Sequence, residues 1–279
     1  MLTALIDDAA MFPPGLMPIG DAVPAHMCHR SSSYGGLVGP LVVAPHALSG
    51  LDLLLDPCHV LELTVVAPDG PQQLPAVLAA ASELSVQLSS VEVTVPSRWS
   101  PDELFGALKC VSTGAIAVFI EIPRDERRFE LIARCGRTPY RAKFRTGGTT
   151  ADLYPDESEL ADAIVASVAA GVPFKATAGL HRAIRNTDPA KGFEQHGFLN
   201  VMAAVRKALE GAKAGELAAV LAERDPKRVV AELTDLDPAS VTALRAQFLS
   251  FGSCSVSDPL LDLAELGLLP PVTAEDLHR

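Results

Sequence analysis

The sequence predicts an α/β protein, a closed (β/α)8 barrel of the TIM type with a C-terminal α-helical extension. Eight strand-like segments recur at intervals of about 25–35 residues, and helical patterns fill most of the intervals. Eight parallel βα units favour closure into a barrel. A doubly wound open sheet is the alternative. It is disfavoured because no Gly-x-Gly-x-x-Gly follows the first strand and no Gly-x-x-x-x-Gly-Lys occurs.

The individual elements follow from apolar runs and from the residues that end them. Ser100 followed by Pro101 indicates the start of a helix, and Gly136 and Gly171 indicate helix ends. Strands are predicted at 2–6, 37–44, 59–67, 86–95, 115–122, 140–146, 172–178 and 197–203. Helices are predicted at 71–83, 100–112, 125–136, 156–170, 204–222, 226–233, 238–250 and 259–267. The barrel is therefore predicted to occupy residues 1–210, with residues 211–279 as a helical extension packed on it.

Composition limits the classes of partner. The 279 residues carry a net charge of −11 without a dense Lys/Arg cluster, which argues against nucleic acid and anionic membrane surfaces. Apolar runs stay short of the roughly 20 residues that span a bilayer. The first eight residues lack the basic region of a signal peptide. The five cysteines are scattered, so we expect reduced thiols in a bacterial cytoplasm, and a homo-oligomer remains open.

Two successive predicted strands each carry a lysine, although a charge in an apolar strand is costly unless it is paired. Side chains alternate along a strand, so Lys143 shares a face with Arg145, and Lys175 shares a face with Thr177. The opposite faces are apolar and suit packing against helices. We therefore expect both lysines to point into the barrel. By the same parity, inward positions are also predicted for Glu62, Glu92, Phe119, Glu121, Gly147, Gly179 and Asn200.

Three acids (Glu62, Glu92 and Glu121) and three bases inside one barrel can neutralise one another. Most of them lie toward the C-terminal ends of their strands, where barrel enzymes hold their active sites. Structural ion pairing is the alternative reading, because buried charges must be paired. A purely structural network of six charges would be a costly core. The cluster is therefore interpreted as a site.

Two motifs carry a resemblance to a known family. Ala-Lys-Phe-Arg-Thr-Gly-Gly (142–148) and Phe-Lys-Ala-Thr-Ala-Gly-Leu-His (174–181) resemble the sixth and seventh strands of deoxyribose-phosphate aldolase, a class I aldolase on a (β/α)8 barrel. The fifth strand of that family ends in a stretch similar to Phe-Ile-Glu (119–121). The resemblance covers roughly residues 116–203.

The resemblance implies roles for these positions. Lys143 would form the Schiff base, and Lys175 would lower the pKa of its amine. Glu121, His181 and Glu92 would move protons. Arg145 departs from the family, which has a small hydroxyl residue there. Candidate substrate-binding residues are Arg145, Thr146, Gly147, Gly148, Thr177, Gly179 and Asn200, with backbone N–H groups of the glycines facing an anion.

The predicted function is an aldolase-like lyase acting on a small anionic carbonyl compound, and this mechanism needs no cofactor. A metal-dependent enzyme is the first alternative. In it a divalent cation would be bound by Asp7, Asp8 and Glu121 on the open face of the barrel. The second alternative is a barrel that binds a small anion without catalysis.

Overall fold

The computed structural model describes residues 1–55 and 60–272. The predicted start of the third strand at residue 59 and the last part of the predicted extension, 273–279, lie outside the described residues.

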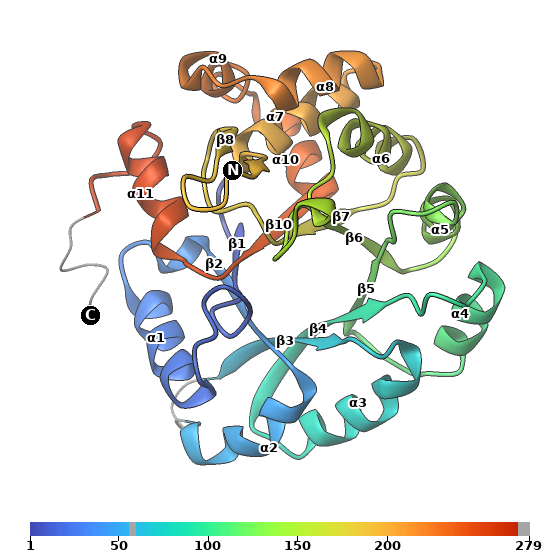
Figure 1. Ribbon diagram of the computed structural model, residues 1–279. Helices are drawn as coiled ribbons and strands as arrows, with labels where there is room; N and C mark the ends of the chain where they lie inside the picture. Colours follow the sequence, from blue (N-terminus) through green and yellow to red (C-terminus); the bar gives the residue numbers. More distant parts are fainter. Residues whose placement is uncertain (56–59, 273–279) are drawn as a thin grey trace.

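A closed barrel of eight parallel strands forms the centre of the described chain, which confirms the predicted fold class (Figure 1). Its strands lie in the order β1-β10-β7-β6-β5-β4-β3-β2 around the barrel. The strands are β1 (Ile6–Asp8), β2 (Val38–Val43), β3 (Leu61–Ala67), β4 (Val86–Thr94), β5 (Ala117–Glu121), β6 (Arg141–Arg145), β7 (Phe174–Thr177) and β10 (Phe248–Ser253).

A helix follows each barrel strand along the chain, and these helices surround the barrel in Figure 1. Helix α4 shows why the local sequence folds this way. Its N-cap Ser100 and Glu103 form a capping box, and Pro101 occupies the first turn. The helices are α1 (Ile19–Ser31), α2 (Leu48–Leu51), α3 (Leu74–Ser82), α4 (Pro101–Lys109), α5 (Arg128–Cys135), α6 (Glu157–Ala169), α7 (Phe198–Leu209) and α11 (Ser257–Glu265).

The eighth barrel strand lies elsewhere than predicted. Residues 198–203 belong to the start of helix α7, and Gly197 is its N-cap. Strand β10 closes the barrel, and its first three residues were predicted as the end of a helix at 238–250. The first eight residues of α7 are all buried, and a short apolar run cannot be assigned to strand or buried helix by periodicity alone. The predicted boundary at residue 210 is therefore wrong, because the barrel includes residues 248–253.

The extra helices accordingly form an insertion before the last strand. Helices α8 (Ala214–Ala222), α9 (Pro226–Ala231) and α10 (Pro238–Gln247) lie between α7 and β10 in the chain. Helix α8 packs on α6 and α7, outside the barrel (Figure 1). After β10, α11 is the one helix among the residues that the structure describes.

Aromatic side chains pack against one another across three neighbouring strands, β6, β7 and β10. The ring centroids of Phe144 and Phe174 lie 5.0 Å apart, and those of Phe174 and Phe248 lie 5.4 Å apart. All three side chains are buried on the outer face of the barrel, as the alternation on β6 and β7 predicts. The inner face of the same strands is thereby left to polar residues.

Asn200 is a structural residue rather than part of the predicted site. Its Oδ1 accepts a hydrogen bond from the backbone N–H of Arg185 at 2.9 Å. Its Nδ2 donates to the carbonyl oxygens of Val220 (2.9 Å) and Glu223 (2.8 Å). The side chain is fully buried and joins α7 to the segment before strand β8 (Asn186–Thr187) and to the end of α8. The difference from the prediction follows from the helix found at 198–209.

Replacing Asn200 by Ala should lower the free energy of unfolding by about 3 kcal/mol, because one buried backbone N–H group and two partly buried carbonyl groups lose their partner. Chemical denaturation measures the change. Asn186→Ala is the matched control, since Asn186 is only partly buried and its side chain makes one hydrogen bond in the described structure. Equal stability of the two variants would contradict this role of Asn200.

Candidate active site

The two lysines of the sequence motifs are direct neighbours inside the barrel. Lys143 on β6 and Lys175 on β7 are paired in the parallel register, at the same level of the barrel. Their side chains are 3% and 2% exposed. Glu121 on β5 is the register partner of Lys143 on the other side. The inward orientation predicted for these three residues is what brings them together.

The buried charges form one alternating chain of anions and cations. Glu92 bridges the two lysines, with 2.6 Å from Oε2 to Lys143 Nζ and 2.6 Å from Oε1 to Lys175 Nζ. Glu121 bridges Lys143 and Arg145, each at 2.9 Å. Lys175 also contacts Asp7, which accepts a hydrogen bond from Ser250. The network thus runs Arg145, Glu121, Lys143, Glu92, Lys175 and Asp7, with three positive and three negative members.

One member of this network differs from the prediction. Asp7 is the third acid, whereas Glu62 lies outside the network and accepts a hydrogen bond from Ser89 at 2.6 Å. Phe119 faces inward as predicted and presents its ring to Lys175 Nζ at 5.2 Å from the centroid.

The ionisation of the network follows from its pairing. Burial raises the pKa of Glu92, but the ammonium groups of Lys143 and Lys175 outweigh it and lower the pKa to about 2. Burial lowers the pKa of Lys143, but Glu92 and Glu121 outweigh it and raise the pKa above its usual value. The pKa of Lys175 is raised in the same way by Asp7 and Glu92. The resemblance implied a lowered pKa for Lys143 next to Lys175. The pKa is raised instead, because Glu92 and Glu121 pair with the ammonium group.

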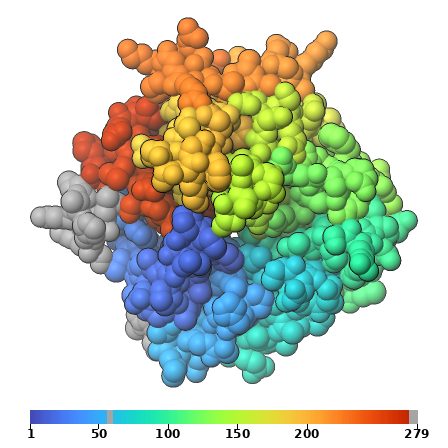
Figure 2. All heavy atoms as spheres, in the orientation of Figure 1, coloured from blue at the N-terminus to red at the C-terminus, as the bar shows by residue number. Residues whose placement is uncertain are grey.

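A cavity of about 250 Å³ lies at the C-terminal ends of the strands and meets one end of the network. Glu92, Lys143 and Arg145 line it, whereas Asp7 and Lys175 are not part of its lining. The blue, gold and yellow-green segments of the chain meet over this part of the molecule in Figure 2. Of the two buried lysines, Lys143 is therefore the one that can reach a ligand in this cavity.

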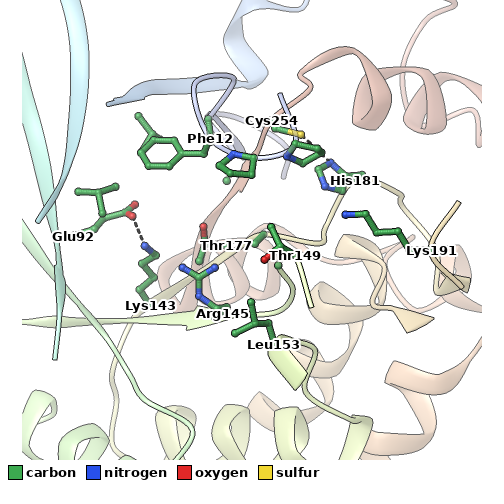
Figure 3. A pocket seen from close by; sticks show the side chains of 18 residues that line it. Phe12, Glu92, Lys143, Arg145, Thr149, Leu153, Thr177, His181, Lys191 and Cys254 are labelled. Carbon is green, nitrogen blue, oxygen red and sulfur yellow. Dashed lines mark hydrogen bonds and ion pairs between the residues drawn. The ribbon is translucent and has the colours of Figure 1, made fainter. Parts of the chain in front are cut away.

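The far end of the cavity carries a second group of polar residues. Figure 3 shows His181, Cys254 and Lys191 there, away from Glu92 and Lys143. His181 Nδ1 lies 3.5 Å from Ser253 Oγ and 3.7 Å from Cys254 Sγ. Burial lowers the pKa of His181, so its imidazole is neutral at neutral pH. It is therefore available as a base.

Some residues of the two predicted glycine-rich turns line the cavity, and others pack the loops that follow β6 and β7 against each other. Gly148 and Thr177 line the cavity, and Gly179 lines an adjoining outer hollow of about 700 Å³ that shares His181. Gly179 has a φ of +76°, and a Cβ there would lie 2.8 Å from the carbonyl oxygen of Thr146.

Two of the predicted binding residues hold the β6 and β7 loops together instead. Thr146 Oγ1 donates to the carbonyl oxygen of Ala178 at 2.6 Å. Gly147 permits the close approach of the two loops, because a Cβ at this position would lie 2.7 Å from Gly179 Cα. Neither Thr146 nor Gly147 is part of the lining of this cavity or of the outer hollow.

The two aspartates proposed as metal ligands are adjacent on β1, so their side chains point in different directions. Asp7 points into the barrel toward Lys175. Asp8 Oδ2 lies 3.0 Å from His26 Nδ1, and its Oδ1 accepts from the backbone N–H of Ala10 at 3.1 Å. Across residues 1–55 and 60–272, no group of three or more His, Cys, Asp and Glu side chains is arranged to hold a metal ion.

Several lining residues were missed by the sequence analysis, and most of them are apolar. Val42 and Val66 precede the ends of β2 and β3, and Phe12 lies in the loop after β1. Strand parity could have identified the two valines, but apolar strand residues alone do not separate a lining from a core. Lys191 comes from the β8 (Asn186–Thr187) to β9 (Glu194–Gln195) hairpin, which was not predicted.

Comparisons with known proteins do not identify a family for this chain. No family model and no curated protein matches the chain. Two solved structures of Rhizobium etli pyruvate carboxylase are similar, one of the T882A variant with acetyl coenzyme A and one of the carboxyl transferase domain with pyruvate. Their TM-scores are 0.39 and 0.38, at 14% and 13% identity, over 95% and 88% of this chain.

The chain spans 27% of the first of these solved chains and 48% of the second. At these TM-scores the similarity does not indicate a shared activity. The search for membrane spans found no helix of sufficient length and apolar character among the described residues.

Replacing Lys175 by Met should lower the free energy of unfolding by about 3–5 kcal/mol at neutral pH, because Asp7 loses its cation in a buried site. Adding Asp7→Asn to this variant should recover part of the loss, since the unpaired charge is then removed. Denaturation of the wild type, both single variants and the double variant provides the cycle. Additive losses would contradict the buried ion pair.

Proposed function

We propose that the chain is an aldolase-like lyase that acts on a small anionic carbonyl compound through a Schiff base on Lys143. The observation that supports this proposal most directly is the position of the Lys143 amine. Lys143 Nζ is held between Glu92 and Glu121 at the wall of the cavity, while Lys175 lies behind it in the charge network. Lys191 is the other amine in the lining, and it is solvent-exposed on the β8–β9 hairpin.

The charge of the network supports covalent chemistry at this amine. An ammonium group and a carbonyl compound give an iminium ion and water, so the positive charge at Lys143 is the same before and after. Glu92 and Glu121 therefore stabilise the resting ammonium and the iminium alike. The costly species is the neutral amine between them, which has to form for attack on the carbonyl carbon.

The same carboxylates relay protons between Lys143, the substrate and solvent. A proton passes from the Lys143 ammonium through Glu92 or Glu121 to water, and the amine then adds to the carbonyl carbon. A proton taken up from water passes back through a carboxyl group to the carbinolamine oxygen, which leaves as water. Lys143 Nζ lies 2.6 Å from Glu92 and 2.9 Å from Glu121 in the resting structure, within hydrogen-bond distance of both.

Cleavage of a carbon–carbon bond requires a base at the other end of the substrate. The neutral imidazole of His181 would accept the proton of a hydroxyl group on the carbon β to the iminium carbon. The bond between the α and β carbons then breaks. Its electron pair moves toward the iminium group to give an enamine, and the fragment with the former hydroxyl group leaves as a carbonyl product. Protonation of the enamine and addition of water then release the second product and restore the Lys143 ammonium.

Borohydride reduction in the presence of a bound carbonyl compound should attach its mass, as a secondary amine, to Lys143. Peptide mapping by mass spectrometry identifies the site. Lys175 serves as an internal control because it is buried outside the cavity lining. An adduct on Lys191 alone, or no adduct with a compound shown to bind, would reject the covalent mechanism. The latter result would favour a barrel that binds small anions.

The initial rate of adduct formation should rise by about tenfold per pH unit from neutral pH upward, because only the neutral amine attacks and the pKa of Lys143 is raised. Glu121→Gln removes one of the two carboxylates that raise this pKa, so its profile should lie at lower pH. Quenching with borohydride at fixed times measures both profiles. A plateau of the wild-type rate near neutral pH would show instead that the pKa of Lys143 is depressed.

A further inference from the structure

Besides the polar group around His181, the lining of the cavity has a charged side and an apolar side. Strands β4 and β6 contribute the charged side chains, which are Glu92, Lys143 and Arg145. The apolar side is formed by β2, β3 and the loop after β1. Its lining residues are Ala9, Phe12, Pro13, Pro14, Val42 and Val66, and none of these side chains carries a hydrogen-bonding atom.

Barrel topology sets part of the apolar side across from Lys143 and Arg145. In the closed strand order, β2 lies four positions from β6, so Val42 is on the strand opposite these two residues. Val66 lies on the next strand, β3, beside its register partner Glu92 on β4. Figure 3 shows Phe12 on the side of the cavity away from Arg145. A ligand that reaches both sides must therefore be charged at one end and apolar at the other.

Arg145 supplies the recognition of the charged end. Its Nε donates to Glu121 Oε1, while Lys143 Nζ contacts Oε2 of the same carboxylate. The guanidinium and the amine are thus held next to each other by one side chain. The Arg145 side chain is 36% exposed and lines the cavity. A guanidinium group pairs with a carboxylate through two parallel hydrogen bonds.

We infer that the substrate is a 2-oxo or 3-oxo acid with a hydroxyl group on the carbon β to its oxo carbon and, beyond that carbon, a branched aliphatic or aromatic substituent. Its carboxylate binds Arg145, its carbonyl carbon faces Lys143 Nζ, and its substituent packs against Phe12, Val42 and Val66. This inference rests on the proposed function and specifies its substrate. The short separation of carbonyl and carboxylate follows from Lys143 and Arg145 sharing the carboxylate of Glu121.

The size and polarity of the cavity agree with such a ligand. An apolar protein cavity of about 150 Å³ accommodates benzene. The present cavity of about 250 Å³ therefore admits one ring or a branched chain together with an oxo acid group. A polyhydroxylated sugar phosphate fits less well, because hydroxyl groups placed against the β2 and β3 side would lose their hydrogen bonds to water without replacement.

Binding of 2-hydroxy acids tests this inference separately from the Schiff base, since these compounds have no carbonyl group for Lys143 to attack. Isothermal titration calorimetry with lactate, 2-hydroxy-4-methylpentanoate and 3-phenyllactate should show affinity rising about ten- to hundredfold with the apolar substituent. Glycerol 3-phosphate is the comparison ligand and should bind more weakly than 3-phenyllactate.

Three variants test which residues bind the carboxylate and which contact the apolar substituent of the ligand. Arg145→Gln should weaken all three hydroxy acids about tenfold or more. Arg141→Gln is its matched control on the same strand, and it should change affinity by less than about twofold because Arg141 packs on Phe119 outside the lining. Val42→Thr conserves the shape and adds a hydroxyl, so it should weaken 3-phenyllactate more than lactate.

Two results would overturn the inference. One is an affinity that does not depend on the apolar substituent, and the other is tighter binding of glycerol 3-phosphate than of 3-phenyllactate. If the hydroxy acids bind as expected but no oxo acid is trapped on Lys143, the substrate class stands and the Schiff-base mechanism fails. If an adduct forms with compounds that lack the apolar substituent, the mechanism stands and the substrate class fails.

Discussion

The structure depends on one charge-balanced network inside the barrel. Glu92 links Lys143 and Lys175, and Glu121 and Asp7 extend the chain to Arg145 and to β1. The members come from β1, β4, β5, β6 and β7, so the network joins strands on both sides of the barrel. Because three cations alternate with three anions, removing any one of them leaves the network with a net charge inside the barrel.

The network has two parts with different surroundings. Asp7 and Lys175 lie outside the cavity lining and stabilise the interior, whereas Glu92, Lys143 and Arg145 meet the cavity. This arrangement accounts for an otherwise costly feature, an ammonium group held by two carboxylates at the wall of an apolar space. Such a group retains its charge through imine formation, and the network can therefore serve catalysis without being rebuilt during the reaction.

Much of this site could be predicted from strand parity. The inward faces of residues 140–146 and 172–178 identified Lys143, Lys175 and Arg145, and the same rule identified Glu92 and Glu121 as their partners. The eighth strand could not be found this way. Three of the six residues of Phe248–Ser253 are Ser or Gly, so the strand has no clear apolar alternation, and it follows helix α10 without a break. Helix α7 took its place in the prediction, since its buried apolar run resembles a strand. The apolar cavity wall depends on strand order, which local sequence does not encode.

Nuclear magnetic resonance tests the central claim most directly, with protein labelled with ¹⁵N at the lysine side chains and a branched 2-oxo acid labelled with ¹³C at its carbonyl carbon. The account predicts a one-bond ¹⁵N–¹³C coupling that appears without reduction, and it assigns the coupled nitrogen to Lys143. Lys143→Met should abolish the coupling, while the wild-type protein with an unlabelled acid provides the background. A saturated complex that shows only the free carbonyl or its hydrate would contradict the account.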